Sequence, residues 1–447
     1  MSDTELTFSP LDGRYKTTLP WELSEQASLK FQLEVEKAWL LLLCEEGLCP
    51  KASVDKINAA FDSVTQEKID EIEATTRHAT RALVEAVMAG LEEQGLSEQA
   101  NWVHVGLTSF DTVDTAQRLR LKSFWYAHGF SKIAELKKVL QTLATKNKDL
   151  KQVGRTHGQW AVPTLFGLSI AEAHERIAEL EPRLLCDVEN LRGQASGAIG
   201  GYHATSLLFK DPIAAEIKFT KELGLKPHYA STQILPPEDI LALAQSAYLM
   251  ASVVAKLATD FRHLARSEIN EVQEGMAKGQ VGSSTMPQKR NPWNLEHICS
   301  LHKILLSKLQ LIEMDVISEH QRDLTNSASG RFYFEFFSVF QLMIERSLKV
   351  FPNLEIHSES MHRNLNSASS SVLAEAFYVL ATKKGLKDAH HFVREASRES
   401  EKSGKDLLEV LSAKKLFDEK IDKEQLFETV LRGSHLKFET ISKKWKE

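Results

Sequence analysis

The chain has 447 residues, of which only 21 are glycine and 12 are proline. Average proteins contain about 7% glycine and about 5% proline, and both residues interrupt regular structure. The composition therefore argues against a turn-rich all-β fold and against a collagen-like or disordered chain. Apolar residues make up 43% of the sequence, enough to bury a large core. The formal net charge of −6 argues against a general nucleic-acid-binding protein, whose surface is usually basic.

The cysteines and the N-terminal segment indicate a cytoplasmic protein. Cys44 and Cys49 are too far apart for a CxxC pair, and Cys186 and Cys299 stand alone, which favours reduced thiols. Segment 1–15 carries acidic residues and no apolar run, unlike a secretory signal. The sequence contains neither an HExxH nor a GxGxxG pattern, so we expect no metal and no cofactor.

Long helices are the predicted elements along the chain. A helix is expected over 131–147, whose apolar residues recur at spacings of three and four: Ile133, Leu136, Val139, Leu140 and Leu143. The segment 165–192 has the same pattern, with a kink expected at Pro182. Residues 239–274 contain no glycine or proline, and a helix through all of them would be roughly 50 Å long. Helices of this length need partners, which predicts an all-α bundle shared between subunits.

The apolar stretch 240–258 raises the question of a membrane span, because it is almost long enough to cross a bilayer. Polar residues interrupt it at Gln245, Ser246, Ser252 and Lys256, and polar sequence follows without a break. This pattern is typical of a helix buried in a protein bundle, and we expect no membrane association.

Glycine is concentrated in 154–167, 193–201 and 275–282. Compact glycine-rich turns between long helices cost stability, so we expect these turns to be functional, with plain helix connections as the alternative. The segment GSSTMPQKRNP at 282–292 is the most specific of them. Its small residues leave backbone N–H groups free to face an anion. Lys289 adds a positive charge, Asn291 adds amide donors, and Ser283 and Ser284 add hydroxyl groups.

This segment matches GSSxMPxKxNP, and through it the chain resembles the fumarase/aspartase superfamily, whose members eliminate fumarate from substituted succinates. Further segments resemble the adenylosuccinate lyases within that superfamily and occur in the expected order: SPLDGRY (9–15), TTRHATRALVEAV (75–87), HVGLTSFDTVDTA (104–116), GRTHGQWAVPTLFG (154–167), ASGAIGGY (195–202), STQILPPED (231–239) and HQRDLTNSASGR (320–331). The resemblance implies a three-domain fold whose central long-helix bundle forms a homotetramer, with each active site built from three subunits. We place the domains at 1–107, 108–352 and 353–447.

The resemblance also implies catalytic roles. Ser283 would be the general base, acting as an alkoxide when its loop closes, and sequence alone leaves Ser284 as the alternative. Lys289 and the N–H groups of the loop would favour that alkoxide and hold the charge that spreads into the substrate carboxylate. His157 would be the general acid, because imidazole titrates near neutral pH. His78 would lie near the phosphate or support the acid.

Substrate-binding roles follow in the same way. The resemblance implies that the nucleotide is contacted by Arg14, Tyr15, Arg322, Ser327 and Arg331. Thr108 and Ser109 would hold a carboxylate on the fumarate side, and Gln233 would hydrogen-bond the substrate. Lys289 and Asn291 would bind the succinyl carboxylates.

Several positions depart from the usual adenylosuccinate lyase pattern: Ala79, Thr80, Phe110, Gln288 and Glu319. MPQK, with Gln288, is more typical of argininosuccinate lyases, so that activity is an alternative, and a carboxymuconate cycloisomerase is a more remote one. A catalytically silent helical scaffold is a third alternative. The presence of Ser283, His157, Lys289 and Asn291 argues against a scaffold, which has no need of them.

Overall fold

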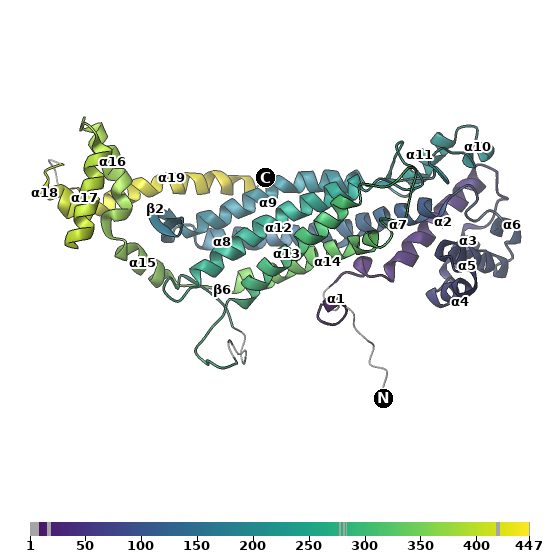
Figure 1. Cartoon of the computed structure of the whole chain (residues 1–447), viewed down its shortest axis with the longest axis horizontal. Helices are drawn as coiled ribbons and strands as arrows, with labels where there is room; N and C mark the ends of the chain where they lie inside the picture. The colour runs from purple at the N-terminus through teal and green to yellow at the C-terminus, as the bar shows by residue number, and fades with distance from the viewer. Residues whose placement is uncertain are drawn as a thin grey trace. The chain divides into compact units, whose positions relative to one another are not determined.

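The computed structural model describes residues 9–15, 19–276, 279, 282, 284–416 and 421–446 (Figure 1). The chain divides into two compact units, which we call the first and the second unit. The first comprises Met1–Ile133, Leu180–Ala251 and Leu301–Met343, and the second comprises Ala134–Glu179, Ser252–Ser300 and Ile344–Glu447. The boundaries between them fall inside long helices: α8 (Phe130–Lys146), α9 (Phe166–Glu189), α12 (Glu238–Leu264), α13 (Trp293–Met314) and α14 (Tyr333–Val350).

The first unit consists of helices joined by loops, with one short parallel pair of strands, β3 and β4. Its remaining elements are α1 (Pro10–Gly13), η2 (Trp21–Leu23), α2 (Ala27–Glu45), α3 (Val54–Asp62), α4 (Gln66–Thr76), α5 (Ala79–Glu93), α6 (Ser97–Ala100), α7 (Ser109–Phe124), the π-helical turn η3 (Trp125–Gly129), β3 (Arg192–Gly193), α10 (Thr205–Leu208), α11 (Pro212–Glu222), β4 (Lys226–Pro227) and η4 (Ser329–Phe332).

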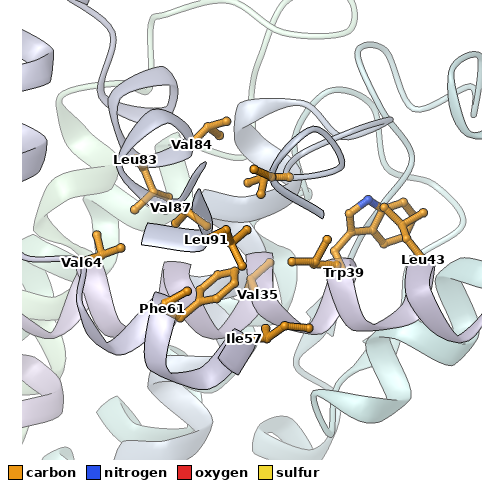
Figure 2. Packing of buried hydrophobic residues seen from close by; sticks show 14 of the residues in the cluster. Val35, Trp39, Leu43, Ile57, Phe61, Val64, Leu83, Val84, Val87 and Leu91 are labelled. Atoms are coloured by element: carbon orange, nitrogen blue, oxygen red, sulfur yellow. The ribbon is translucent and has the colours of Figure 1, made fainter. Parts of the chain in front are cut away.

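The core of the first unit lies where α2 packs against α3 and α5 (Figure 2). Val35 and Trp39 lie four residues apart on α2 and are buried, as expected for one face of a helix. The Trp39 ring meets Phe219 edge-to-face with ring centroids 5.3 Å apart. Its indole Nε1 donates a hydrogen bond to the carbonyl of Val105 at 2.9 Å. This bond attaches the core to the loop that precedes α7, a helix that is capped by Thr108 and begins at Ser109.

The second unit contains two antiparallel strand pairs and a group of C-terminal helices. Its elements are β1 (Lys151–Thr156), β2 (Gln159–Leu165), β5 (Val272–Glu274), η5 (Phe351–Asn353), β6 (Leu354–Ile356), α15 (Ser358–Ser367), η6 (Ser369–Leu373), α16 (Ala374–Lys383), α17 (Ala389–Ser403), α18 (Leu407–Ala413), α19 (Lys423–Lys443) and η7 (Lys444–Lys446). Val153 of β1 is buried in a cluster that includes Leu365 of α15 and Phe377 of α16. The hairpin of β1 and β2 is thereby packed against the C-terminal helices.

Two of the three predicted helices are confirmed, since α8 and α9 occupy the segments 131–147 and 165–192, with Pro182 inside α9. The continuous helix over 239–274 is wrong, because α12 ends at Leu264. Asn270 takes a left-handed conformation with φ of 50°, and residues 272–274 pair with β6 as a strand. Among the described residues the strands form only two-stranded sheets, so the all-α class is confirmed, and the three-domain division stays a prediction.

Helix α12 contains the apolar stretch that raised the question of a membrane span. Among the described residues it is the one helix whose length and composition would allow it to cross a bilayer. Its most apolar window is 61% buried in the structure, as in the core helix of a bundle.

Candidate active site

In the first unit, Asp111 of α7 joins the glycine-rich segment 193–201 to the start of its own helix. Its carboxylate is fully buried and accepts hydrogen bonds from the backbone N–H groups of Thr108 (2.8 Å), Ser196 (3.1 Å) and Gly197 (3.1 Å). Burial raises the pKa of Asp111 to about 7, although the three N–H donors act in the opposite direction. The bonds fix the segment 195–202 beside the N-terminus of α7.

The next turns of α7 hold the segment that contains Gln233. Asp114 accepts a hydrogen bond from the backbone N–H of Leu235 at 2.8 Å. Arg118, which is also buried, forms an ion pair with Asp239 at 3.1 Å and donates to the carbonyl of Pro236. Through Asp111, Asp114 and Arg118, helix α7 therefore holds both the segment 195–202 and the segment 231–239.

Arg322 and Gln233, both predicted to contact substrate, are in direct contact. Arg322 Nη1 donates to Gln233 Oε1 at 2.7 Å, and the Gln233 backbone N–H donates to the carbonyl of Gln321 at 3.1 Å. The guanidinium carbon of Arg322 lies 3.7 Å from the centre of the Phe110 ring, at the start of α7. Three of the predicted segments therefore meet here within one unit.

His78 and Ser109 line a single cavity of about 600 Å³ in the first unit. His78 is the residue before α5, and its Nδ1 accepts a hydrogen bond from the backbone N–H of Arg81 at 3.3 Å. The backbone bond therefore leaves Nε2 as the only ring nitrogen that carries a proton when His78 is neutral. The cavity is also lined by Arg81, Asn101 and His104, so it presents positive and hydrogen-bonding groups that suit an anionic ligand.

His104, which the sequence prediction missed, is paired with a fully buried carboxylate. Its Nδ1 lies 2.7 Å from Glu36 Oε1, which also accepts a hydrogen bond from the hydroxyl of Thr112 at 2.6 Å. Burial alone would lower the pKa of His104, but the hydrogen bond and the charge of Glu36 outweigh it, and the pKa is raised. His104 is thus a titratable group in the wall of the cavity, and Glu36 favours its protonated form.

The other predicted residues of the first unit are more exposed and make fewer contacts with the rest of the site. Arg14 directly follows α1 and is exposed, and Tyr15, the next residue, is half-buried. Ser327 and Arg331 are exposed on the segment between α13 and α14. Among the described residues, the side chains of Arg14, Ser327 and Arg331 form no hydrogen bond or ion pair with another predicted site residue. The segment itself is held by Asp315, which accepts from Ser329 Oγ at 2.7 Å and from the hydroxyl of Tyr333 at 2.8 Å.

In the second unit, His157 is at the exposed tip of the hairpin formed by β1 and β2. Thr156 pairs with Gln159, which leaves a two-residue turn at His157 and Gly158. Their φ angles are 55° and 74°, the left-handed values that such a turn requires and that glycine adopts without strain. Within the described part of the chain the imidazole of His157 has no hydrogen-bond partner, so its ring nitrogens are available to a ligand.

The base of the hairpin is anchored by Glu271, a fully buried residue that lies outside all the sequence segments named above. Its carboxylate takes two hydrogen bonds from Arg155, at 2.7 and 3.1 Å, and one each from Gln152 (2.6 Å) and Asn364 (2.7 Å). Arg155 is two residues before His157, so this bidentate ion pair fixes the strand that carries the predicted acid.

The predicted loop at 282–292 is held at both ends in the second unit. Glu274 accepts hydrogen bonds from the N–H of Leu295 (2.7 Å) and from the backbone and side chain of Asn294, so it joins β5 to the start of α13. Asn291 Nδ2 donates to the carbonyl of Gly282 at 3.2 Å. A Cβ at Gly282 would lie 2.4 Å from the carbonyl oxygen of Lys289, so this close approach requires glycine.

Lys289 and Ser284 are exposed on this loop, and Ser283 lies outside the described residues. The structure therefore brings together His78 with Ser109, Gln233 with Arg322, and Asn291 with the backbone of its own loop. His157 lies on a separate element of the second unit. Among the described residues, no group of three or more histidine, cysteine or acidic side chains is arranged to hold a metal ion.

The fold is shared with known lyases. A family model described as lyase matches residues 18–303, and one described as adenylosuccinate lyase C-terminal matches residues 318–429. A solved fumarate lyase from Mesorhizobium superposes with a TM-score of 0.81 at 22% identity, covering 94% of this chain and 96% of that one. A muconate cycloisomerase from Acinetobacter calcoaceticus superposes with a TM-score of 0.79 at 21% identity, covering 94% and 96%. The chain thus has the fold of the fumarase/aspartase superfamily of lyases.

Two curated relatives define the family more narrowly. The adenylosuccinate lyase of Archaeoglobus fulgidus is 33% identical over 425 residues, covering 93% of this chain and 91% of that protein. The adenylosuccinate lyase of Pyrococcus abyssi is 35% identical over 419 residues, covering 90% and 89%. The chain belongs to the adenylosuccinate lyase family.

Proposed function

We propose that this chain is an adenylosuccinate lyase, a carbon–nitrogen lyase that releases fumarate. It would split adenylosuccinate into AMP and fumarate, and the succinyl-aminoimidazole-carboxamide ribotide of purine biosynthesis into its amide and fumarate. The observation that carries the proposal is family membership over nearly the whole chain. It is combined with the presence of four residues in the matching sequence motifs: Ser283, His157, Lys289 and Asn291.

The reaction removes a proton from the carbon next to a carboxylate and expels a nitrogen. The carbanion that forms is adjacent to a negative charge, so the reaction needs a positioned base and nearby cations or dipoles. We assign the base to Ser283, with Lys289 and the loop N–H groups stabilising the charge that develops on the carboxylate. We assign protonation of the departing nitrogen to His157, whose exposed and unpaired imidazole can meet a ligand.

Binding of a phosphate and two carboxylates requires several cations in one cleft, although the chain as a whole is acidic. We assign nucleotide contacts to Arg14, Tyr15, Arg322, Ser327 and Arg331. Thr108 and Ser109 would hold a carboxylate on the fumarate side, Lys289 and Asn291 would bind the succinyl carboxylates, and Gln233 would hydrogen-bond the substrate. His78 would lie near the phosphate or support the acid. The contact between Arg322 and Gln233, and the shared cavity of His78 and Ser109, support a grouping of these residues in the first unit.

We further propose a cytoplasmic homotetramer with shared active sites. Large apolar side chains are exposed on and after α13 in the first unit: Ile304 (41% exposed), Leu306 (42%), Met314 (70%), Ile317 (79%) and Leu324 (70%). Exposed apolar surface of this extent is typical of a subunit interface. It supports the expectation that α13 belongs to a bundle completed by other subunits.

The proposal is tested by incubating the purified protein with adenylosuccinate or argininosuccinate and following fumarate by ultraviolet absorbance. Fumarate from adenylosuccinate alone is the expected result. Fumarate from argininosuccinate alone would support the second candidate, which Gln288 favours, and would contradict the first. No fumarate from either compound would contradict the proposal and would favour a scaffold or a different substrate.

A further inference from the structure

Phe110 is a half-buried aromatic residue at the second position of α7. Its ring lies under the guanidinium group of Arg322, with Cζ 3.7 Å from the ring centre. A guanidinium at this distance over an aromatic face is held by the ring quadrupole and by stacking. Both residues belong to the first unit, and more than two hundred positions separate them in the sequence.

The hydrogen bonds of Arg322 show which part of the guanidinium remains available. Nη1 donates to Gln233 Oε1 at 2.7 Å. Gln233 is itself fixed, because its Nε2 donates to the carbonyl of Ala198 at 2.9 Å. Among the described residues, the guanidinium of Arg322 makes no other hydrogen bond, so Nε and Nη2 keep free N–H groups. Arginine presents such groups as a planar fork that fits a carboxylate or a phosphate.

The neighbouring acidic side chains do not bind the free edge of Arg322, which is formed by its Nε and Nη2 groups. Asp323 is adjacent in sequence, but its carboxylate accepts hydrogen bonds from Thr325 and from the backbone N–H of Glu319. Asp114 is buried and accepts from Leu235, and its charge acts on Arg322 without a hydrogen bond. The free edge of Arg322 is therefore not neutralised by a bidentate carboxylate of its own unit.

We propose that Phe110 is a positioning residue for substrate binding: its ring and Gln233 together fix the plane of Arg322, so that the free N–H edge meets an oxyanion of the substrate. One face of the guanidinium is covered by the ring, and one donor is occupied by Gln233. The remaining donors are thus oriented before the ligand arrives, which reduces the ordering cost of binding. The identity of the substrate rests on the proposed function, but the role of Phe110 requires only an oxyanion, either a phosphate or a carboxylate.

The first test compares Phe110→Leu, which keeps an apolar side chain but removes the ring, with Phe110→Tyr, which keeps the ring. With adenylosuccinate we expect Phe110→Leu to raise KM about 3- to 10-fold while kcat changes less than about twofold. Phe110→Tyr should restore KM to within about twofold of the wild-type value. Thermal unfolding of both variants is measured in parallel. Equal KM values for wild type, Phe110→Leu and Phe110→Tyr would overturn the proposal, as would a loss confined to kcat.

A double-mutant cycle with Arg322→Lys tests whether Phe110 acts through Arg322. Lysine keeps the charge but lacks the planar fork. We expect Arg322→Lys to raise KM and the addition of Phe110→Leu to raise it no further, because the two residues act as one unit. Strictly multiplicative effects would show that Phe110 acts independently of Arg322 and would contradict the proposal.

A binding measurement separates this inference from the proposed function, because it needs no turnover. Inorganic phosphate and succinate are titrated into wild type, Phe110→Leu and Phe110→Tyr, and binding is followed by calorimetry. We expect Phe110→Leu to weaken binding of one probe about 3- to 10-fold, and the affected probe identifies the oxyanion as phosphate or carboxylate. If this occurs while the wild type releases no fumarate from adenylosuccinate, the inference holds and the proposed function fails. If neither probe binds the wild type, or neither binding constant depends on Phe110, the inference fails.

Discussion

His157 combines an unusual backbone conformation with a free side chain. It is the first residue of a two-residue hairpin turn with φ of 55°, a conformation in which few residues other than glycine and asparagine are common. Two residues earlier, Arg155 is fixed by the buried carboxylate of Glu271. A rigid hairpin base and an exposed tip are what a positioned proton donor requires.

The substitution His157→Asn separates the role of the turn from the role of the acid. Asparagine followed by glycine is the preferred pair for this turn, so we expect the hairpin and the thermal stability to be retained. Because the proton donor is removed, kcat for fumarate release should fall by at least ~10²-fold. His362→Asn, a change at an exposed histidine of α15, provides the control and should leave kcat unchanged. Near-normal turnover in His157→Asn would contradict the assignment.

The pair of His104 and Glu36 predicts a pH dependence of stability. Burial lowers the pKa of His104 in the folded state, but the hydrogen bond and the charge of Glu36 outweigh this effect, so the pKa is raised. The charge of Asp111 also raises the pKa, and the charge of Arg81 lowers it. Protonation of His104 therefore stabilises the fold fully below its unfolded pKa of about 6.5, and this contribution is lost as the pH rises through the folded value.

We expect the free energy of unfolding in urea to decrease in the wild type as the pH rises above about 6.5. The decrease should be smaller in His104→Gln, which cannot be protonated. Identical slopes for the two proteins over this range would contradict a raised pKa at His104.

At the scale of elements, the sequence predicts what depends on local periodicity and misses what depends on distant partners. Helices α8 and α9 follow from apolar spacing, because each helix buries its own stripe. The end of α12 at Leu264 does not follow from apolar spacing. It depends on the pairing of β5 with β6, a strand about eighty residues further along the chain. Glu271 lies 116 residues from its partner Arg155, so no local signal marks it as an anchor.

For the site, too, the sequence predicts some features and misses others. The sequence motifs predict the residue types at the hairpin and at the loop 282–292, since the proposed chemistry needs these types. They do not predict that Asp111 bonds to the backbone at 196 and 197, or that Phe110 lies under Arg322. Each of these contacts joins segments that become neighbours only when the helices pack.

Glu274 connects β5 to the start of α13 and so closes the base of the loop between them. We expect Glu274→Ala to lower the free energy of unfolding by about 1–3 kcal/mol, because Asn294 and Leu295 lose a shared buried acceptor. Fumarate release should fall as well, because Ser283 and Lys289 lie on the loop. Glu359→Ala, at an exposed acid in the first turn of α15, is the matched control and should change stability by less than about 0.5 kcal/mol. Equal effects of the two substitutions, measured by urea unfolding, would show that Glu274 is no anchor.

At the scale of the whole molecule, the predicted residues are distributed over both units. Arg14, His78, Thr108, Gln233 and Arg322 belong to the first, whereas the hairpin with His157 and the loop with Lys289 and Asn291 belong to the second. The proposed homotetramer would complete each site with residues from three subunits. The proposed tetramer would also cover the apolar side chains that are exposed on and after α13.

Mixing two inactive variants tests the shared site. If His157 and Ser283 reach one site from different subunits, then co-expressed His157→Asn and Ser283→Ala chains form some sites with both wild-type residues. Random assembly of equal amounts would restore roughly one quarter of the wild-type activity. Fumarate release by the co-expressed pair is compared with that of each variant alone. No recovery in a mixed tetramer, verified by tags on both chains, would contradict the shared-site proposal.

The most direct test of the central claim is the rate of fumarate release from adenylosuccinate by the wild-type protein and by Ser283→Ala, with AMP quantified in the same samples. The account predicts equal amounts of fumarate and AMP from the wild type. It predicts a rate at least ~10²-fold lower from Ser283→Ala, with thermal unfolding unchanged. An absence of fumarate from the wild type, or an undiminished rate in Ser283→Ala, would contradict it.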